Sequence, residues 1–249
     1  MTRAIRVTVV RAVGSTPRAA GAVMQVTRER IEGTIGGGQL EWQALKAARD
    51  MLDEGTITAE QEFTLGPSLR QCCGGRVLLR FEATDQPFAE PLPTHAQQLV
   101  LLGAGHIGQA LLRVLAPLPW QITVFDPRPD WLPEPGPHLV VRHDPEPGPT
   151  VAAAPPGACY VVATHSHDLD LDVVDLVLRR GDARWLGLIG SMTKRRKFER
   201  RLIARGHPSS ALGRLICPMG LPTIRDKHPA AIAISVAAEL LSLPEEPSA

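Results

Sequence analysis

The sequence predicts an α/β protein: a carboxyl-terminal Rossmann-type domain with a doubly wound parallel sheet, preceded by a smaller α+β domain. Two observations carry this prediction. After residue 98, short apolar runs alternate with amphipathic helical segments, the pattern of a parallel sheet covered on both faces. Earlier in the chain, β-branched runs surround a single helical segment. The proline-rich stretch 83–97 has no periodicity, so we expect a linker between domains at 1–82 and 98–249.

The composition is that of an ordinary globular protein. Hydrophobic residues make up 44% and charged residues 21% of the 249 positions, enough for two domains with cores of their own. The formal net charge of +1 gives no field that would recruit nucleic acid or an anionic membrane. The chain starts with charges where a signal peptide needs an apolar stretch, and no apolar run reaches the ~18 residues of a membrane span. We expect a cytoplasmic protein with neither a nucleic-acid nor a membrane partner.

The four cysteines do not suggest a disulfide framework. Cys72 and Cys73 are adjacent, so their Cα atoms lie about 3.8 Å apart, closer than the ~4.4–6.8 Å of an unstrained bridge. Cys159 and Cys217 could pair only if the fold brought them together. This cysteine usage fits a reducing compartment. No Cys-x-x-Cys or His-x-x-x-His spacing occurs, so a structural zinc site is not expected.

The elements of the first domain follow from β-branched runs and one apolar stripe. Leu40, Ala44, Ala48 and Met51 recur at helical spacing, and Gly55 follows them as a helix terminator. The expected elements are strands at residues 5–13, 22–27 and 31–35, a helix at 39–52, and closing strands at 62–65 and 76–82.

Two glycine-rich turns of this domain are candidate anion sites. Gly36, Gly37 and Gly38 open the predicted helix, where free N–H groups and the positive end of the helix dipole favour phosphate. The turn Gly14-Ser15-Thr16-Pro17-Arg18 adds hydroxyls and a guanidinium that could reach the same place. The alternative is simple turn chemistry, which the sequence alone favours over ligand binding.

Cys72 and Cys73 are the least common feature of the first domain. They stand before Gly74 and Gly75 in a turn that also has arginines on both sides. A thiol in such surroundings is readily deprotonated and can bind a soft metal or carry sulfur. The alternative is a pair of small, half-buried residues in a hairpin, because free cysteine is commonly buried.

The second domain is predicted as alternating strands and helices. The expected strands are at residues 99–102, 122–125, 138–142, 159–163, 185–189 and 215–217, and the expected helices at 107–115, 169–180, 193–205 and 229–241. A proline-rich excursion at 127–156 replaces the helix that usually joins the second and third strands.

The turn that opens this domain has the G-x-G-x-x-G pattern, at Gly103, Gly105 and Gly108. The first glycine permits a tight turn, the second lets a phosphate approach the backbone, and the third allows close helix–strand packing. Asp126 ends the next strand, where an acid can accept a hydrogen bond from a ribose hydroxyl. A dinucleotide is therefore one candidate ligand, and a Rossmann-shaped scaffold without one is the alternative.

His165 and His167 follow a core strand, at the edge where open α/β sheets bind ligands. Either histidine could act as an acid, a base or a metal ligand. The plainer interpretation is a loop in which Asp168 or Asp170 caps the next helix. The helix at 193–205 is strongly basic, which is typical of a solvated face, an anion-facing helix start or a surface for an acidic partner.

Taken in order, these segments resemble the xanthine dehydrogenase accessory protein family (XdhC, related to the CoxI group). No single segment is specific, but the ordered set covers almost the whole chain. One departure is that residues 221–226 lack the small, glycine-containing stretch associated with this position. The segments that carry the resemblance are Gly14-Ser15-Thr16-Pro17-Arg18, Gly33-Thr34-Ile35-Gly36-Gly37-Gly38, Gln71-Cys72-Cys73-Gly74-Gly75, the Gly103 turn, Phe125-Asp126-Pro127-Arg128, Thr164-His165-Ser166-His167-Asp168, Gly187-Leu188-Ile189-Gly190-Ser191, Cys217-Pro218-Met219-Gly220-Leu221 and the last helix.

The resemblance implies a chaperone, not a catalyst in its own right. Members of the family are understood to bind the molybdenum cofactor (molybdopterin), protect it from oxidation and support its sulfuration by a cysteine desulfurase. They then deliver it to apo xanthine dehydrogenase. The candidate cofactor-binding residues are Gly36, Gly37, Gly38, Cys72, Cys73, Gly103, Gly105, Gly108, Asp126, His165 and His167, with Cys72 and Cys73 near the molybdenum.

Two other functions stay open on the sequence. One is an NAD(P)-dependent oxidoreductase that uses the Gly103 turn, with His165 or His167 as acid–base. The other is a non-catalytic regulatory module that senses a nucleotide. A homodimer is the expected assembly, because symmetric dimers are the commonest oligomers.

Overall fold

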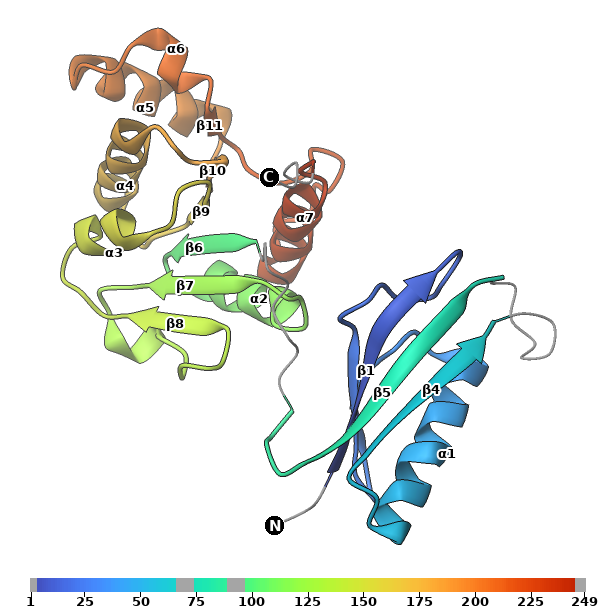
Figure 1. Cartoon of the computed structure of the whole chain (residues 1–249). Helices are drawn as coiled ribbons and strands as arrows, with labels where there is room; N and C mark the ends of the chain where they lie inside the picture. Colours follow the sequence, from blue (N-terminus) through green and yellow to red (C-terminus); the bar gives the residue numbers. More distant parts are fainter. Residues whose placement is uncertain (1–3, 66–73, 89–96, 245–249) are drawn as a thin grey trace. The chain divides into compact units, whose positions relative to one another are not determined.

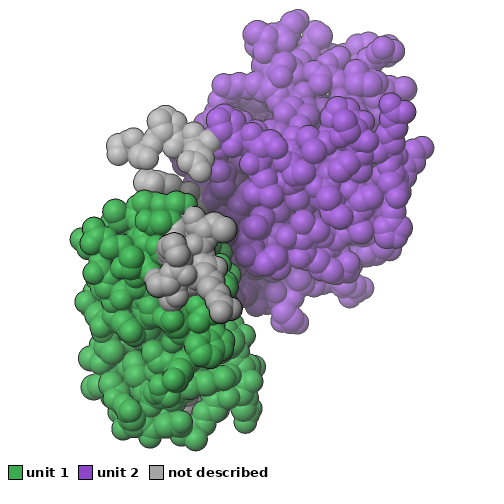
Figure 2. Space-filling model, turned by 90° about the vertical axis from the view of Figure 1, so that its right-hand side faces the viewer, with its two compact units in different colours: residues 1–93 green, residues 94–249 purple. Residues whose placement is uncertain are grey.

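The structure, a computed structural model, describes residues 4–65, 74–88 and 97–244. The chain divides into two compact units, Met1–Pro93 and Thr94–Ala249, which Figure 2 colours separately. Each unit contains its own sheet and its own buried core. No helix within the described ranges is long and apolar enough to cross a membrane.

The first unit is an antiparallel sheet with one helix along it (Figure 1). The strand order is β3-β2-β1-β5-β4, and the apolar stripe of the helix packs into the core through Leu40, Ala44 and Ala48. Inward-facing residues of β1 and β5 alternate with exposed or half-buried ones, as a sheet covered on one face requires. The elements are β1 (Ala4–Val13), β2 (Val23–Val26), β3 (Ile31–Gly33), α1 (Gly38–Glu54), β4 (Thr58–Thr64) and β5 (Arg76–Thr84).

Two strands of this unit are longer than the sequence predicts. β4 begins at Thr58, not at residue 62, because Thr58 to Thr64 pair with β5 along their whole length. Apart from the half-buried Ala59, the added residues are exposed and polar, so no apolar pattern marks them. β5 continues to Thr84, where Ala83 and Thr84 pair with the start of β1.

The second unit is a parallel sheet covered on both faces, which confirms the predicted fold class (Figure 1). The strand order is β11-β10-β9-β6-β7-β8, and each neighbouring pair is parallel. Helices α2 and α7 share one core with the sheet, and α3, α4 and α5 share the other. The strands are β6 (Gln98–Leu102), β7 (Gln121–Phe125), β8 (Leu139–Arg142), β9 (Cys159–Val162), β10 (Trp185–Leu188) and β11 (Leu215–Ile216); the helices are α2 (His106–Leu115), α3 (Gly148–Ala153), α4 (His167–Arg180), α5 (Met192–Ala204), α6 (Ser209–Leu212) and α7 (Pro229–Leu241).

The proline-rich excursion contains more structure than we expected. No α-helix of the described chain joins β7 to β8, as predicted, but α3 lies later in the excursion, between β8 and β9, and Val151 of α3 is buried in the core beside α4. Pro149 sits in the first turn of α3, where the missing N–H group has no cost. A 3₁₀ turn, Pro129–Trp131, follows β7 and places Trp131 near the Gly103 turn. Both elements, like α6, are too short to leave a periodic signal.

Candidate functional site

The three glycines of the second-unit turn have different surroundings. A Cβ on Gly103 (φ 115°) would lie 2.2 Å from the carbonyl oxygen of Ala163, and a Cβ on Gly108 would lie 2.1 Å from that of Gly103. These two glycines are therefore required by strand and helix packing. A Cβ on Gly105 would meet nothing closer than Nη2 of Arg128, at 3.9 Å. Gly105 is thus the glycine at which a ligand can approach the backbone.

Asp126 is completely buried at the end of β7 and is saturated by protein donors. Its Oδ2 accepts from the Ala104 N–H (2.9 Å) and from Nη2 of Arg128 (2.8 Å). Its Oδ1 accepts from Nε (2.9 Å) and the backbone N–H (3.0 Å) of Arg128. A ribose hydroxyl, the partner that the sequence suggests for this carboxylate, would have to displace one of these donors.

The same contacts set the charge states of this pair. Burial pushes the pKa of Asp126 upward, but the hydrogen bonds from the Arg128 side chain and from the backbone N–H groups of Ala104 and Arg128 outweigh it. The net result is a lowered pKa, so the carboxylate is ionised at neutral pH. The pKa of Arg128 is raised in turn by its hydrogen bond to Asp126. Arg128 had no role in our sequence-based site, although its position two residues after Asp126 was a usable signal.

A cavity of about 390 Å³ opens beside Gly105 and Arg128. It lies beyond the carboxyl ends of β6, β9 and β10, the edge where ligands bind in open α/β sheets. The Arg128 guanidinium lies 5.0 Å from the centroid of the Trp131 ring, and His106 meets that ring edge-on at 5.0 Å. The lining residues are Gly105, His106, Ile107, Arg128, Trp131, Ala163, Thr164, His165 and Ile189.

A buried ion pair supports the wall of this cavity. Nζ of Lys194 donates to Oδ2 of Asp170 (2.6 Å) and to the carbonyl oxygen of Ile189 (2.9 Å). Oδ1 of Asp170 accepts from the backbone N–H (2.9 Å) and the hydroxyl (2.7 Å) of Thr164. Both charged side chains are at most 10% exposed. The network joins the loop after β9 to the loop after β10, so it fixes two walls of the cavity together.

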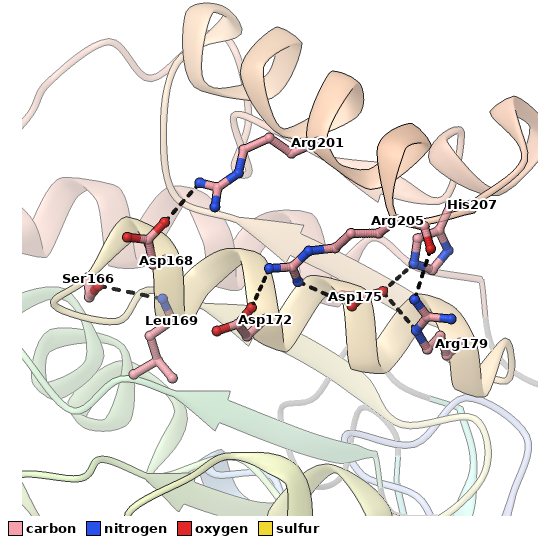
Figure 3. A network of polar contacts seen from close by, with 9 residues as sticks. All are labelled: Ser166, Asp168, Leu169, Asp172, Asp175, Arg179, Arg201, Arg205 and His207. Carbon is pink, nitrogen blue, oxygen red and sulfur yellow. Dashed lines mark hydrogen bonds and ion pairs between the residues drawn. The ribbon is translucent and has the colours of Figure 1, made fainter.

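The structure separates the two histidines of the loop after β9. His165 is exposed and lines the cavity, whereas His167 begins α4 and is not among the lining residues. The expectation that Asp168 or Asp170 caps α4 was wrong. Ser166 is the N-cap, its hydroxyl accepting from the Leu169 N–H (3.5 Å). Asp168 instead pairs with Arg201 of α5 (Figure 3).

Several basic side chains of helix α5 form ion pairs within the protein. Lys194 is buried against Asp170, Arg195 pairs with Glu199 (2.8 Å), and Arg201 pairs with Asp168 (2.8 Å). These partners come mostly from α4 or from α5 itself. Lys194 and Arg201 therefore join α5 to α4, whereas the ion pair of Arg195 lies within α5.

The sequence motifs of the first unit meet at one end of its sheet. A Cβ on Gly36 would lie 2.3 Å from Cβ of Pro17, so the helix start packs against the turn after β1. A Cβ on Gly75 would lie 2.6 Å from the carbonyl oxygens of Val13 and Ser15. Gly75 follows Cys72 and Cys73, which themselves lie outside the described residues. Three segments that are far apart in the chain thus form one loop cluster.

An internal carboxylate occupies part of this loop cluster. Oε2 of Glu41 accepts from the Thr34 hydroxyl (2.6 Å) and from the N–H groups of Ile35 and Gly37 (both 3.1 Å). The donors at the start of α1 therefore already serve one anion, which supports their affinity for negative charge. An anionic ligand at Gly36, Gly37 and Gly38 would share these donors with Glu41. Glu41 was not among the candidate residues from the sequence, although an acid in the first turn of a helix is a recognisable signal of a helix start.

The remaining cysteines do not form a reactive site in the described part of the chain. Cys159 and Cys217 are both buried, and they do not form a disulfide with each other. Burial raises the pKa of the Cys217 thiol, although Lys194 and Arg195 partly oppose this. Within the described residues, no three His, Cys, Asp or Glu side chains gather closely enough to hold a metal ion.

The comparisons with known proteins agree with this two-unit geometry. A family model described as the XdhC Rossmann domain matches residues 99–240, and one described as the XdhC and CoxI family matches residues 2–62. The chain belongs to the XdhC and CoxI family. The resemblance drawn from the sequence motifs is therefore confirmed, and the two matches fall on the two units of this XdhC-type protein.

Two similar proteins extend the comparison. The chain is 30% identical over 244 residues to the uncharacterized protein YqeB of Escherichia coli K12. This alignment covers 92% of the chain but only 41% of YqeB. The chain therefore spans less than half the length of that relative. A crystal structure titled as a xanthine dehydrogenase from Bacillus halodurans aligns with a TM-score of 0.67 at 18% identity, over 97% of this chain and 91% of that one. This likeness shows the fold of the XdhC-type chain.

Proposed function

We propose that this XdhC-type protein is an accessory protein of xanthine dehydrogenase that binds the molybdenum cofactor and delivers it to the apo enzyme. Membership of the XdhC and CoxI family supports the accessory role. The observation that carries the cofactor-binding role is the loop cluster of the first unit, where the turn at 14–18, the helix start at 36–38 and Gly75 meet. Turns that are scattered in sequence and joined in space are typical of a binding site on a rigid scaffold.

The chemistry of the cofactor fits the residues of both units. The cofactor is a pterin with an anionic phosphate and a dithiolene-bound molybdenum. Either of two glycine-rich helix starts, at Gly36–Gly38 or at Gly103, Gly105 and Gly108, would serve the anion, and Cys72 and Cys73 would serve the soft metal. When bound, the group supplies the redox-active metal. The protein's residues hold it, orient it and shield it from water and oxygen.

We assign sulfuration to a partner enzyme. A cysteine desulfurase would supply the sulfur while the cofactor is bound, and the XdhC-type protein would present the cofactor without catalysing a reaction itself. A homodimer completes the proposal, and light scattering after size-exclusion chromatography tests that assembly.

The alternative function, an NAD(P)-dependent oxidoreductase, has one favourable observation. His165 and the open backbone at Gly105 line the same cavity, so an acid–base group and a phosphate-binding turn are adjacent there. The saturated carboxylate of Asp126 disfavours NAD as the cofactor of this alternative, because Arg128 holds the carboxylate that would bind the ribose hydroxyl; an arginine at this position is compatible with the 2′-phosphate of NADP.

The deciding experiment is purification without oxygen from a host that makes the cofactor. We expect pterin fluorescence after oxidation, molybdenum in similar molar amount, and restoration of activity when the loaded protein is mixed with apo xanthine dehydrogenase. The same preparation from a host unable to make the cofactor is the control. Tight NAD binding without pterin or molybdenum would exclude the proposal in favour of the oxidoreductase.

A further inference from the structure

The cavity of the second unit offers donors for a single oxyanion. A guanidinium has five N–H donors, and Asp126 accepts from two of those of Arg128, at Nε and Nη2. The other donors belong to a side chain that is 34% exposed and lines the cavity. Because the buried carboxylate fixes the inner edge of the guanidinium, its outer edge is held in one orientation before any ligand arrives.

The backbone adds donors at the same place. Helix α2 begins at His106, so the N–H groups of its first turn have no intrahelical partners and lie at the positive end of the helix dipole. His106 and Ile107 line the cavity together with Gly105, whose missing side chain leaves the backbone open. A guanidinium and a helix start that face one cavity form the donor set that binds a phosphate group.

The contacts of Asp126 disfavour the binding of NAD in this cavity. A Rossmann site holds the adenosine ribose through an acid at the end of the second strand, with its oxygens free to accept. Here all four contacts of Asp126 are made by Ala104 and Arg128. The cavity volume, about 390 Å³, is also near the low end of the ~300–1,000 Å³ usual for ligand sites. The small cavity and the lack of a free carboxylate oxygen on Asp126 for a ribose hydroxyl thus favour a compact ligand with one phosphate.

We infer that this cavity is a phosphate-monoester site that selects against NAD. The guanidinium lies over the ring of Trp131, which the His106 ring meets edge-on, so the group that carries the phosphate would lie beside an aromatic surface. The inference rests on the proposed function in one respect: the natural occupant would be the terminal phosphate of the pterin cofactor. A free nucleoside monophosphate has the same chemistry and is the other source to be tested.

Titration calorimetry on the full-length protein tests the site with inorganic phosphate, adenosine monophosphate and NAD as probes. We expect phosphate and the monophosphate to bind, and NAD to bind no more tightly than the monophosphate. Arg128→Gln should weaken phosphate binding about tenfold or more, since charge-assisted hydrogen bonds are lost. Because Arg128 also supports buried Asp126, a second variant is needed.

Gly105→Val is that second variant. Its Cβ has no neighbour closer than 3.9 Å, and the φ of −65° at this residue suits any side chain, so the fold should be kept while the phosphate is blocked. Gly213→Val is the matched control, because its φ of −62° suits any side chain, its Cβ has no neighbour closer than 3.6 Å and it lies outside the cavity lining. Phosphate affinity unchanged in Gly105→Val, or NAD binding that is tighter than monophosphate binding and depends on Gly105, would overturn the inference.

A cofactor-loading arm separates this inference from the proposed function. Gly105→Val, purified without oxygen from a cofactor-producing host, should retain less pterin than Gly213→Val. Full pterin retention by Gly105→Val would overturn the inference and leave the proposed function standing. A different outcome is that the wild-type protein binds phosphate and monophosphate in a Gly105-dependent way but never retains pterin. This result would support the phosphate site and identify the free monophosphate as its occupant. It would also contradict the proposed function.

Discussion

Single residues of the second-unit turn divide the work of folding and binding. Gly103 is confined by φ 115° and by the carbonyl oxygen of Ala163, while Gly105 faces open space with an ordinary backbone conformation. A sequence pattern treats both as one motif. The structure gives the first a packing role and leaves the second available to a ligand.

Gly103→Ala is therefore expected to destabilise the second unit, whereas Gly105→Ala is not. The added methyl group at Gly103 would overlap the backbone of Ala163 in a conformation that alanine disfavours, at a cost of at least about 2 kcal/mol. Denaturant titration followed by circular dichroism measures both variants. Equal stability of the two alanine variants would contradict the assignment of separate roles.

Asp126 makes a prediction about acid stability. Its pKa is lower in the folded protein than the ~3.9 of an unfolded aspartate, so its stabilising contribution is present above pH ~3.9 and is lost as pH falls through the folded pKa. Asp126→Asn should lower stability at neutral pH by about 1–3 kcal/mol and flatten the decline below pH ~4. The neighbouring exposed Asp130, changed to Asn, is the control. If the stability of Asp126→Asn fell as steeply below pH ~4 as that of the wild type, Asp126 would not be the cause of the acid sensitivity.

The thiols of Cys72 and Cys73 are predicted to act on the cofactor and not on the fold. The double variant Cys72→Ser/Cys73→Ser should lower cofactor retention after anaerobic purification, because hydroxyl groups are poor ligands for a soft metal. Thermal unfolding of the cofactor-free protein should be unchanged, which serves as the control for folding. Unchanged cofactor retention would mean that the two thiols are only structural.

At the scale of elements, the contact between α4 and α5 is a graded row of ion pairs (Figure 3). Asp168 pairs with Arg201 at the exposed end, and Asp172 pairs with Arg205 in the middle. At the buried end Asp175 contacts Arg179, Arg205 and His207, and the His207 side chain is only 5% exposed. Burial raises the pKa of Asp175, but hydrogen bonds and nearby cations outweigh it and lower the pKa overall.

This gradient predicts unequal effects from matched substitutions. Asp175→Ala would leave buried His207 and Arg179 without their carboxylate and would leave Arg205 with Asp172 alone, at a cost of about 2 kcal/mol or more. Asp168→Ala removes an exposed ion pair and should leave stability nearly unchanged, because solvent screens such pairs. Urea unfolding midpoints compare the two. Equal losses would show that the row stabilises the helix pair as a whole, without a buried anchor.

What could be predicted from the sequence depends on how local the determinant is. The parallel sheet, the Gly103 turn and α7 follow from apolar periodicity and glycine spacing, which are local. α3 and most of β4 were missed because a six-residue helix and an exposed polar strand have no periodic signal of their own. The Lys194–Asp170 pair was missed for another reason: its two residues lie on different helices, which only the fold brings together. Arg128 lies two residues from its partner Asp126, so it was a local signal that we did not use in the sequence-based site.

At the scale of the whole molecule, the cores of the two units are separate. The first core is made by α1 and its antiparallel sheet, and the second unit has one core on each face of its parallel sheet. The two family models also match separate parts of the chain. We therefore expect the two units to unfold independently of each other, each according to the packing of its own core.

A matched pair of core substitutions tests this independence in the full-length chain. Leu79 belongs to the first core and Leu111 to the core around α2, and both are fully buried. Replacing either by alanine should cost about 2–5 kcal/mol, through lost apolar burial and the cavity left behind. Hydrogen exchange read by mass spectrometry should then show lost protection in peptides of the first unit for Leu79→Ala and of the second unit for Leu111→Ala. Lost protection in both units from either substitution would mean that the two cores unfold as one cooperative body, because local opening is confined only where stability is local.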